Sequence, residues 1–494
     1  MNKRLIIYIL GWVLIVEAVA MQLCTLTSLI YREHEGLYFL LTGVVSGGLG
    51  VAAVTIKKPK NMVLYQKAGF AATALSWILL SVVGAMPFWI SREIPNLVDA
   101  VFETVSGFTT TGATILRDVE ALSHGMLLWR SLMHWLGGMG VIVFLLALIP
   151  KLGGQQNIFL MRAESPGPII GKAVPKMRHY ATMLYGIYFG LTLLEFVFLL
   201  FGGMPVFDAL NTSFATAGTG GFGIHNANVA AYSSHYLQTV IAVFMMLFGV
   251  NFSFYILLIA RKFGQAFRME ELWVYFGIIT ACTVAIAFNI MPLYNNNPGE
   301  AFHQSFFYVS SIITTTGFGI GDVNHWPMLS KAIIIVITFV GAMAGSTGGG
   351  FKIARIVLLF KEARKEISLL VHPRNVKTVK MDGKPVNHNI MRNTSVYLVV
   401  YTGIFVVSFI LVSITMDGTL ERAGGLFSNV ETSFTAVAAT LNNTGPGLGL
   451  VGPVGNYADM SIFSKFVLMF DMLAGRLELF PLLLLFSPTA WKKA

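Results

Sequence analysis

The sequence predicts an all-α polytopic membrane protein with two N-terminal spans and four helix–pore-loop–helix repeats, arranged with pseudo-fourfold symmetry around one central pore. Three observations predict it. Of 494 residues, 55% are hydrophobic and 12% charged, with a mean hydropathy of +0.70, which is too apolar for an ordinary soluble domain. Many apolar windows are long enough to cross a bilayer. A short Ser/Thr-rich stretch that ends in Thr-Gly occurs four times between such windows.

Ten apolar windows come near or above the roughly 20 residues that a helix needs to cross the hydrocarbon core. They are residues 5–30, 37–56, 68–90, 126–149, 180–201, 237–260, 272–290, 332–360, 394–415 and 462–486. The first window resembles a secretory signal, because Lys3 and Arg4 precede an apolar run that reaches Ala20. Glu17 interrupts the part of a signal that should be neutral, and the apolar run continues to residue 30. We therefore expect it to be retained as a span.

The distribution of lysine and arginine indicates the orientation. If ten spans alternate, the basic stretches 57–67, 151–178, 261–268 and 361–392 and both ends of the chain fall on one side. Such an excess marks cytoplasmic loops, so we expect both termini in the cytoplasm. This bias accounts for the net charge of +10 and the pI of about 9.4, and nucleic acid binding is not needed to explain them.

After an N-terminal hairpin (1–67), the chain divides into four units with boundaries at 68–179, 180–271, 272–393 and 394–494. Each unit holds, between its two spans, an apolar segment too short to cross: 96–108, 205–216, 300–313 and 429–441. We expect each to be a half-helix that enters the membrane and stops at its Thr-Gly turn. Irregular backbone at this depth is tolerated only where it is buried in protein or lines a water-filled path.

The four Thr-Gly turns predict a filter for a cation. Their glycines lie 108, 97 and 128 residues apart, as copies of one structural unit would. Glycine allows backbone carbonyls to turn inward, and threonine hydroxyls add oxygen ligands. One such turn would indicate no more than helix packing, whereas four favour a filter. The expected ligands are Thr110, Thr111, Gly112, Gly218, Thr219, Gly220, Thr315, Thr316, Gly317, Asn443, Thr444 and Gly445.

The second span of each unit also carries a glycine at a matching distance from its turn: Gly137, Gly249, Gly345 and Gly475. In the third unit this glycine begins a run of six small residues, Gly345, Ser346, Thr347, Gly348, Gly349 and Gly350. Each glycine lowers helix stability by up to about 1 kcal/mol, so we expect the helix to break here. The resulting loop would lie below the filter and act as a gate. The alternative is a kink that allows close helix packing. The amphipathic stretch 356–370 predicts a cytoplasmic helix that transmits a partner's movement to this loop.

Arg476 lies near the middle of the last predicted span, where a charge is a functional candidate by default. Below the filter it would repel a cation and control its passage. The alternative is a structural pair with Glu478 or Asp471. The acidic residues of the half-helices, Asp99, Glu103, Asp208 and Glu431, either make the outer mouth negative or act as partners for helix N-termini.

No cofactor site is expected. The two cysteines, Cys24 and Cys282, fall inside predicted spans, and the histidines, including His134 and His225, show no metal-ligand spacing. Gly-x-Gly-x-x-Gly occurs at 218–223 and 447–452. Both copies lie at filter turns rather than after a strand, so they do not indicate a nucleotide site.

The four Thr-Gly turns, the glycine-rich break at 345–350 and the sequence around Asn443, Gly445 and Arg476 resemble the potassium-translocating membrane subunit of the bacterial Trk system, over essentially the whole chain. The N-terminal hairpin looks like the Trk branch of the Trk/Ktr/HKT superfamily. The resemblance implies K⁺ as the transported ion, a homodimer in the lipid of a bacterial inner membrane with one pore per protomer, and a cytosolic nucleotide-binding regulatory subunit. It also assigns the filter glycines to Gly112, Gly220, Gly317 and Gly445, the gating loop to 345–350 and the pore arginine to Arg476. The second turn departs from the pattern, because Ala217 and Gly218 precede Thr219 where the first and third turns have threonines.

We therefore expect a non-enzymatic protein for potassium uptake, with a gated, K⁺-selective, channel-like pore driven by the membrane potential. The alternative is a symporter that couples K⁺ to Na⁺ or H⁺. The parallel orientation of the repeats, and the position of Glu17 and Glu195 outside the pore-facing halves of the filter units, weigh against coupling. A scaffold or receptor without transport would leave the four turns unexplained.

Overall fold

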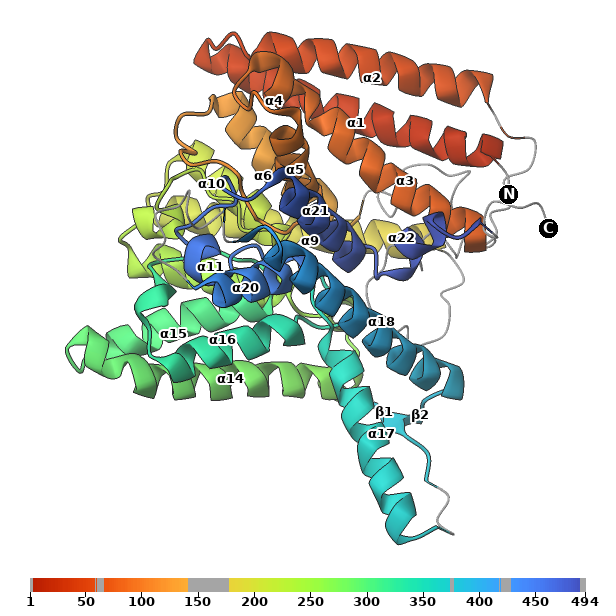
Figure 1. Ribbon diagram of the computed structural model, residues 1–494, viewed down its shortest axis with the longest axis vertical. Coiled ribbons are helices and arrows are strands. Elements are labelled where there is room, and N and C mark those ends of the chain that lie inside the picture. Colours follow the sequence, from red (N-terminus) through yellow and green to blue (C-terminus); the bar gives the residue numbers. More distant parts are fainter. Residues whose placement is uncertain are drawn as a thin grey trace.

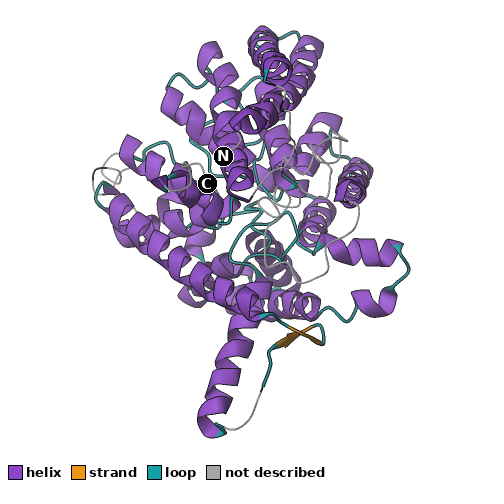
Figure 2. Ribbon diagram, turned by 90° about the vertical axis from the view of Figure 1, so that its right-hand side faces the viewer, coloured by secondary structure: helices purple, strands orange, loops and turns teal. Residues whose placement is uncertain are grey.

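The computed structural model describes residues 3–57, 59, 66–140, 177–373, 377–416, 418 and 428–488. Regular structure in these residues is almost entirely helical (Figure 2). The two described strands, β1 (Lys380–Met381) and β2 (Lys384–Pro385), form a short antiparallel pair beside the middle of α17 (Ile353–Val371), where Lys361 Nζ donates to Lys380 O at 2.8 Å (Figure 1). Figure 1 shows α17 extending away from the other helices.

The first two helices, α1 (Lys3–Tyr31) and α2 (Gly36–Ile56), form a hairpin along one side of the molecule (Figure 1). Glycines allow their backbones to approach closely, as is usual for helices in membranes. A Cβ on Gly50 would collide with the carbonyl oxygen of Gly11, and one on Gly43 with Gln22. The predicted first span is thus one uninterrupted helix, and α1 also packs against α3 (Gln66–Gly84) and α6 (His124–Gly138).

Four short helices correspond to the predicted half-helices, with ends within two residues of the expected ones. They are α5 (Leu97–Phe108), α10 (Val206–Ala217), α15 (Pro298–Ile313) and α20 (Asn429–Leu441). Side-chain oxygens of Asn96, Asn297 and Ser428 cap the first turns of α5, α15 and α20, and each of the four helices has an acidic residue in its first turn. Both features stabilise a helix N-terminus.

Six helical stretches in the described residues are long and apolar enough to span a membrane, by length and composition. They are Lys3–Tyr31, Gly36–Ile56, Lys67–Ser91, His179–Phe201, Glu270–Tyr294 and His388–Ser413. They match the predicted hairpin and the predicted first span of each unit. The helices that carry them are α1, α2, α3 with α4 (Met86–Ser91), α9 (Met177–Phe201), α14 (Glu270–Ile290) with the short η3 (Met291–Tyr294), and α18 (His388–Ser413).

The second spans of the second and fourth units are broken where a continuous helix is predicted, whereas that of the third unit is broken as expected. α11 (His235–Phe248) and α12 (Phe252–Ile259) meet at an angle of 88°. α16 (Met328–Val340) ends twelve residues before α17 begins, and α21 (Ile462–Arg476) is separated from α22 (Phe480–Leu485) by a turn in which Glu478 and Leu479 have positive φ. In the first unit α6 ends at Gly138, and the expected continuation at 141–149 lies outside the described residues. The remaining described helices are α13 (Phe263–Ala266), η2 (Asn228–Ala231), η4 (Val323–His325) and η5 (Gly449–Val451).

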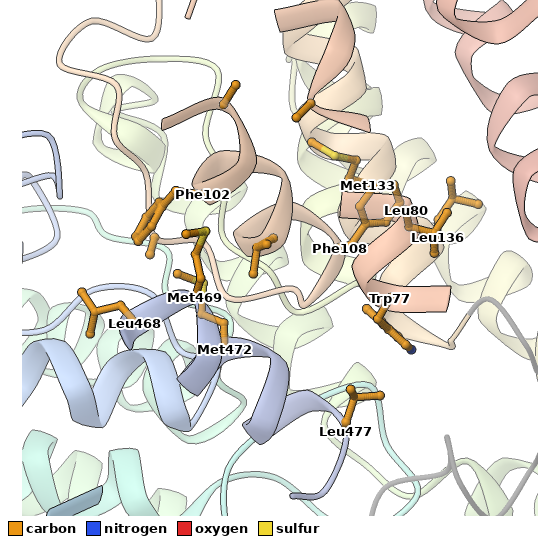
Figure 3. Packing of buried hydrophobic residues seen from close by; sticks show 14 of the residues in the cluster. Trp77, Leu80, Phe102, Phe108, Met133, Leu136, Leu468, Met469, Met472 and Leu477 are labelled. Atoms are coloured by element: carbon orange, nitrogen blue, oxygen red, sulfur yellow. The ribbon is translucent and has the colours of Figure 1, made fainter. Parts of the chain in front are cut away.

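The hydrophobic core lies where the half-helices pack against their flanking spans. Trp77 of α3, Phe102 and Phe108 of α5, Met133 of α6 and Met472 of α21 are fully buried and lie in one cluster (Figure 3). The outer helices expose large apolar side chains, as is typical of surfaces that face lipid. On α2 these include Val44, Val45 and Leu49.

Candidate ion pore

The four half-helices end in turns with one backbone conformation. In each, the residue two positions after the end of the helix is left-handed: φ is 53° at Thr110, 51° at Thr219, 58° at Thr315 and 55° at Asn443. Two residues further on, a glycine has positive φ: 82° at Gly112, 79° at Gly221, 81° at Gly317 and 89° at Gly445. We call residues 110–112, 219–221, 315–317 and 443–445 the first, second, third and fourth turns.

This geometry corrects the alignment of the second turn. The Thr-Gly pattern matches Gly220 with Gly112, but the backbone matches Gly221 with Gly112 and Gly220 with Thr111. The hydrogen bonds agree, because Gly220 N donates to Ala215 O at 2.9 Å just as Thr111 N donates to Ser106 O at 2.9 Å. Gly218 therefore lies where the first turn is preceded by Thr109, and the second turn lacks two threonine side chains that the first and third share.

The four turns contact one another in cyclic order. A Cβ on Gly112 would collide with the carbonyl oxygen of Gly220, one on Gly221 with that of Thr316, one on Gly317 with that of Thr444, and one on Gly445 with that of Thr111. Each glycine therefore allows the close approach of the neighbouring turn, and the fourth turn closes on the first. A cavity of about 150 Å³ lies against this ring and is lined by Gly112, Gly221, Gly317 and Gly445, with Thr114, Arg130 and Tyr457 among its other residues.

Two hydroxyl groups of the ring lack a hydrogen-bond partner among the described residues. They are the buried hydroxyls of Thr110 and Thr444. The Thr111 hydroxyl lies 2.8 Å from that of Thr109 and accepts a 3.0 Å hydrogen bond from Asn443 Nδ2. Buried polar atoms normally have partners, so unpaired hydroxyls at this position fit a site whose partner is a mobile cation.

The acidic residues of the half-helices are all partnered in the structure. Asp99 accepts a 2.6 Å hydrogen bond from Lys465 Nζ, and Glu431 lies 3.5 Å from Lys331. Asp208 accepts from the Tyr232 hydroxyl at 2.8 Å, and burial together with this carboxylate raises the pKa of Tyr232. Glu103 pairs with Arg130, a residue that the sequence analysis did not single out.

The break expected at Gly345 to Gly350 is confirmed. Residues 341–352 form a buried loop between α16 and α17, directly against the third and fourth turns. Gly349 N donates to the Thr315 hydroxyl at 2.5 Å, and a Cβ on Gly349 would collide with Asn442 O. On the other side, Phe252 N donates to Gly345 O at 3.0 Å, so the break in the second unit holds the loop in place.

Arg476 contacts this loop. Its guanidinium donates to Thr347 O at 2.9 Å, and to Gly137 O and Gly138 O at 2.5 Å each. The two acidic residues considered as its structural partners have other contacts: Glu478 binds Arg355 and Asp471 accepts from Ser408 at 2.7 Å. Arg476 thus joins the end of α6 to the apex of the loop.

Glu271, at the start of α14, holds both ends of the loop region. Its Oε1 accepts from Ala344 N at 2.7 Å and from Ala354 N, in the first turn of α17, at 3.1 Å. The side chain is buried. Nothing in its local sequence distinguishes Glu271 from Glu270 beside it, so the sequence analysis did not find it.

The glycines expected to match across the second spans have different neighbours. Gly137 and Gly475 lie against the carbonyl oxygens at the ends of the half-helices in their own units, Phe108 O and Leu441 O. Gly249 approaches Thr314 of the next unit, and Gly345 lies in the loop. His134 is fully buried behind the second turn, where Nε2 accepts from Phe222 N at 3.3 Å and Nδ1 lies 2.8 Å from Gly107 O. No cluster of potential metal-ligating side chains occurs in the part of the chain that the structure describes.

Helices long and apolar enough to span a membrane, four short helices between them and a buried ring of backbone turns are the architecture of a helical membrane protein. The comparisons agree. The TrkH family, described as a cation transport protein, matches residues 39–276 and 267–493, and the chain belongs to this family.

Relatives match over their full length. The Trk system potassium uptake proteins TrkH of Salmonella typhimurium (strain LT2) and Escherichia coli (strain K12) are each 37% identical over 503 residues, covering 100% of both chains. The crystal structure of the potassium transporter TrkH from Vibrio parahaemolyticus aligns with a TM-score of 0.86 and 32% identity, covering 100% of each chain. These relatives belong to a transport family that is not enzymatic.

Proposed function

We propose that this protein takes up potassium across a bacterial inner membrane, through a gated, K⁺-selective, channel-like pore. The four turns form the filter, with the four units placed around it in pseudo-fourfold symmetry. The observation that carries the proposal is the cyclic contact of the turns, in which each glycine backbone touches the next turn and the fourth touches the first. A K⁺ ion passing the ring would exchange its water for carbonyl oxygens and for hydroxyls such as those of Thr110 and Thr444. The names of the full-length relatives support potassium as the ion.

Residues 341–352 are the proposed gate. The loop lies against the third and fourth turns, and Arg476 places a positive charge at the same level. A cation leaving the ring meets both. The gate opens when the loop moves away from Thr315 and Thr347 O leaves Arg476.

The wider assembly follows from the Trk system named in the relatives. We propose a homodimer with one pore in each chain, both termini in the cytoplasm, and a cytosolic nucleotide-binding regulatory subunit that acts on α17. This helix projects from the molecule, and Arg355 in its first turn binds Glu478, two residues from Arg476. Movement of α17 would therefore reach both the loop and the arginine through the first turn of the helix. K⁺ is the transported ion, and we propose no cofactor in this chain.

The second candidate function is proton-coupled potassium symport. Glu17 favours it, because this carboxylic acid is fully buried in α1 and neither oxygen has a hydrogen-bond partner among the described residues. Intramembrane carboxylates often carry protons in transporters.

Reversal potentials of the purified protein in planar bilayers test both functions. A channel-like pore gives a potential that follows the K⁺ gradient alone and does not change with a pH or Na⁺ gradient. A potential that shifts with the pH gradient in the natural protein and not in Glu17→Gln establishes proton coupling instead. Rescue of growth at low K⁺, in cells that lack their own uptake systems, tests potassium uptake independently of mechanism. Cells that express the protein in the membrane and still fail to grow would overturn it.

A further inference from the structure

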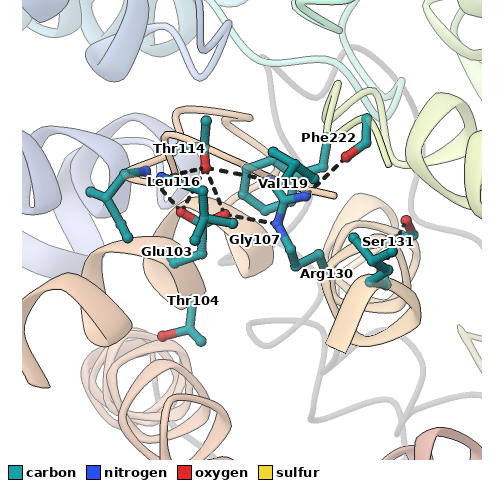
Figure 4. Close-up of polar contacts among 12 residues, drawn as sticks. Glu103, Thr104, Gly107, Thr114, Leu116, Val119, Arg130, Ser131 and Phe222 are labelled. Carbon is teal, nitrogen blue, oxygen red and sulfur yellow. Dashed lines mark hydrogen bonds and ion pairs between the residues drawn. The ribbon is translucent and has the colours of Figure 1, made fainter. Parts of the chain in front are cut away.

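An ion pair lies behind the first two turns of the ring. Glu103, on α5, and Arg130, on α6, have side chains that are 0% and 2% exposed, and Arg130 Nε donates to Glu103 Oε1 at 2.8 Å (Figure 4). Such a pair is weak evidence for stability, because removing two charges from water costs about as much as their attraction returns. The contacts that the two side chains make with other segments indicate the role of the pair.

Glu103 holds the segment that follows the first turn. Its two carboxylate oxygens accept from the Thr114 hydroxyl at 3.0 Å each, and Oε2 accepts from Ile115 N at 3.0 Å. Thr114 lies two residues after Gly112, the glycine that touches the second turn. The carboxylate thus fixes the segment that follows the first turn, at Thr114 and Ile115, to α5, the half-helix that precedes that turn.

Arg130 holds the segment that follows the second turn. Its NH1 group donates to Gly223 O at 2.9 Å, and the centre of its guanidinium lies 4.1 Å from the centre of the Phe222 ring. Arginine suits this position because its planar group can form a hydrogen bond at each edge and stack on an aromatic face at the same time. The ion pair therefore links the segment that follows the first turn to the segment that follows the second turn.

The second turn needs such support more than the others. It contains Gly220 and Gly221 and is preceded by Gly218. It therefore lacks the pair of threonine hydroxyls that lie 2.8 Å apart at the start of both the first and the third turn. A backbone rich in glycine has more conformational freedom to lose on ordering. Contacts from outside the turn must then fix it, and Arg130 and His134 supply them on Phe222 and Gly223.

The support is specific to this side of the ring. At the position of Glu103, the other half-helices have Thr212, Tyr308 and Ala436. The Tyr308 hydroxyl donates to Gly321 O and accepts from Gly321 N at 2.9 Å, which is a neutral brace for the third turn. In the described residues, a buried ion pair braces only the junction of the first and second turns.

We propose that Glu103 and Arg130 are positioning residues that set the ion preference of the pore, by fixing the spacing between the first and second turns. The inference rests on the proposed function of the ring. Where a filter selects K⁺ over Na⁺ by the size of its cavity, its oxygens must keep their positions around the ion, since the smaller ion is favoured when the ring contracts. Loosening this junction lets the glycine-rich turn move inward and lowers the preference for K⁺.

The test compares three conservative variants. Arg130→Lys keeps the charge and loses the planar group, Glu103→Gln keeps the shape and loses the charge, and Phe222→Leu removes the ring beneath the guanidinium without leaving a buried charge unpaired. Asp471→Asn is the control, because Asp471 is an equally buried carboxylate bound to Ser408. The permeability ratio of K⁺ to Na⁺ is measured from bi-ionic reversal potentials in bilayers. Size-exclusion chromatography and thermal unfolding report folding.

We expect K⁺ current to persist and the permeability ratio to fall by about fivefold or more in Arg130→Lys and Glu103→Gln, at the lower end of coupling between sites. Phe222→Leu should shift it in the same direction by less, and Asp471→Asn should leave it unchanged. An unchanged ratio in folded Arg130→Lys overturns the proposal. If neither charge variant folds, an unchanged ratio in Phe222→Leu does so. Absence of K⁺ current in the natural protein would instead overturn the proposed function.

Discussion

Arg476 binds three backbone carbonyl oxygens from two separate parts of the chain, the end of α6 and the apex of the loop at 341–352. Guanidinium is suited to this because its donors spread in a plane, whereas a lysine has one compact charge. The side chain therefore has two effects at one position: it presents a positive charge near the ring, and it holds the loop through Thr347 O.

Replacing Arg476 by alanine should raise basal K⁺ flux. A hydrogen bond from a charged group contributes about 1.5–3 kcal/mol, and losing the one to Thr347 O shifts the loop toward the open state by about tenfold or more. Flux of ⁸⁶Rb⁺ into liposomes without the regulatory subunit measures this. Arg476→Lys keeps the charge and should give an intermediate flux. Unaltered flux in Arg476→Ala would show that the arginine is structural.

The filter glycines give a second prediction at this scale. Gly112→Ser, Gly221→Ser and Gly317→Ser each place a side chain against the neighbouring turn and in a left-handed conformation, which costs about 1–2 kcal/mol for an L-residue. The preference for K⁺ over Na⁺ should fall by about tenfold, the change that 1.4 kcal/mol produces. Competition of Na⁺ with ⁸⁶Rb⁺ uptake is the measurement. Serine at Gly403, which has open space around it on α18, is the matched control. Unchanged selectivity in Gly112→Ser and Gly317→Ser would contradict the filter assignment.

The residues of the ring were predictable from sequence to within one position. Ser/Thr-rich ends of apolar segments followed by glycine located all four turns, because few other residue types allow this backbone. In the second turn two consecutive glycines follow Thr219, and residue identity alone could not decide which has positive φ. The hydrogen bond from Gly220 N to Ala215 O decides it. Arg130, His134 and Glu271 act on the backbone of distant segments, so no local pattern reveals them.

At the scale of elements, the main difference from expectation is in the second spans. Hydropathy depends on composition, and the apolar stretch 237–260 continues through its break, so the pattern predicted one helix. The backbone at the break has one distant partner and one local cap: Met343 N donates to Gly249 O at 3.2 Å, and Ser253 N, at the start of α12, donates to Asn251 Oδ1 at 2.8 Å. Only the third unit shows its break in sequence, because six small residues occur in succession there.

Glu271 provides a prediction about this interrupted architecture. Its carboxylate accepts from backbone groups on both sides of the loop, so Glu271→Ala leaves the N–H groups of Ala344 and Ala354 without their acceptor. A buried donor left unpaired costs about 1–3 kcal/mol in the closed state, which should raise basal ⁸⁶Rb⁺ flux severalfold. Glu271→Gln keeps one acceptor oxygen and should have a smaller effect. Asp459→Asn, which weakens an exposed pair with Arg117, is the control. Normal basal flux in folded Glu271→Ala would show that the contacts of Glu271 with the loop do not control gating.

Shortening the loop tests the gate directly. Removing residues 345–350 and joining the ends with two glycines takes away the contacts to Thr315, Arg476 and Phe252 together. We expect a flux that stays high whether or not the regulatory subunit is present. A shortened protein that still opens and closes in response to the regulator would refute the gate and favour the packing kink.

At the scale of the whole molecule, the ring is completed inside one chain, since the turn at 443–445 contacts the turn at 110–112. A dimer would then contain two independent pores. A tandem dimer that joins one natural copy to one copy with Gly112→Asp, which places a bulky charge in the ring, should conduct about half as much as the natural tandem per complex, since each chain encloses its own path. Single-channel recording should show one active pore. Complete loss of current would place the conducting path between the chains.

The covalent continuity of the ring also has a consequence for how its sequence can change. In a channel assembled from four identical subunits, one altered codon changes all four sides at once. Here each side is encoded separately, so a substitution alters a single quadrant while three remain intact. The glycines at 218 and 220, and the buried Glu103–Arg130 pair beside the first and second turns, are the kind of divergence that this genetic arrangement permits.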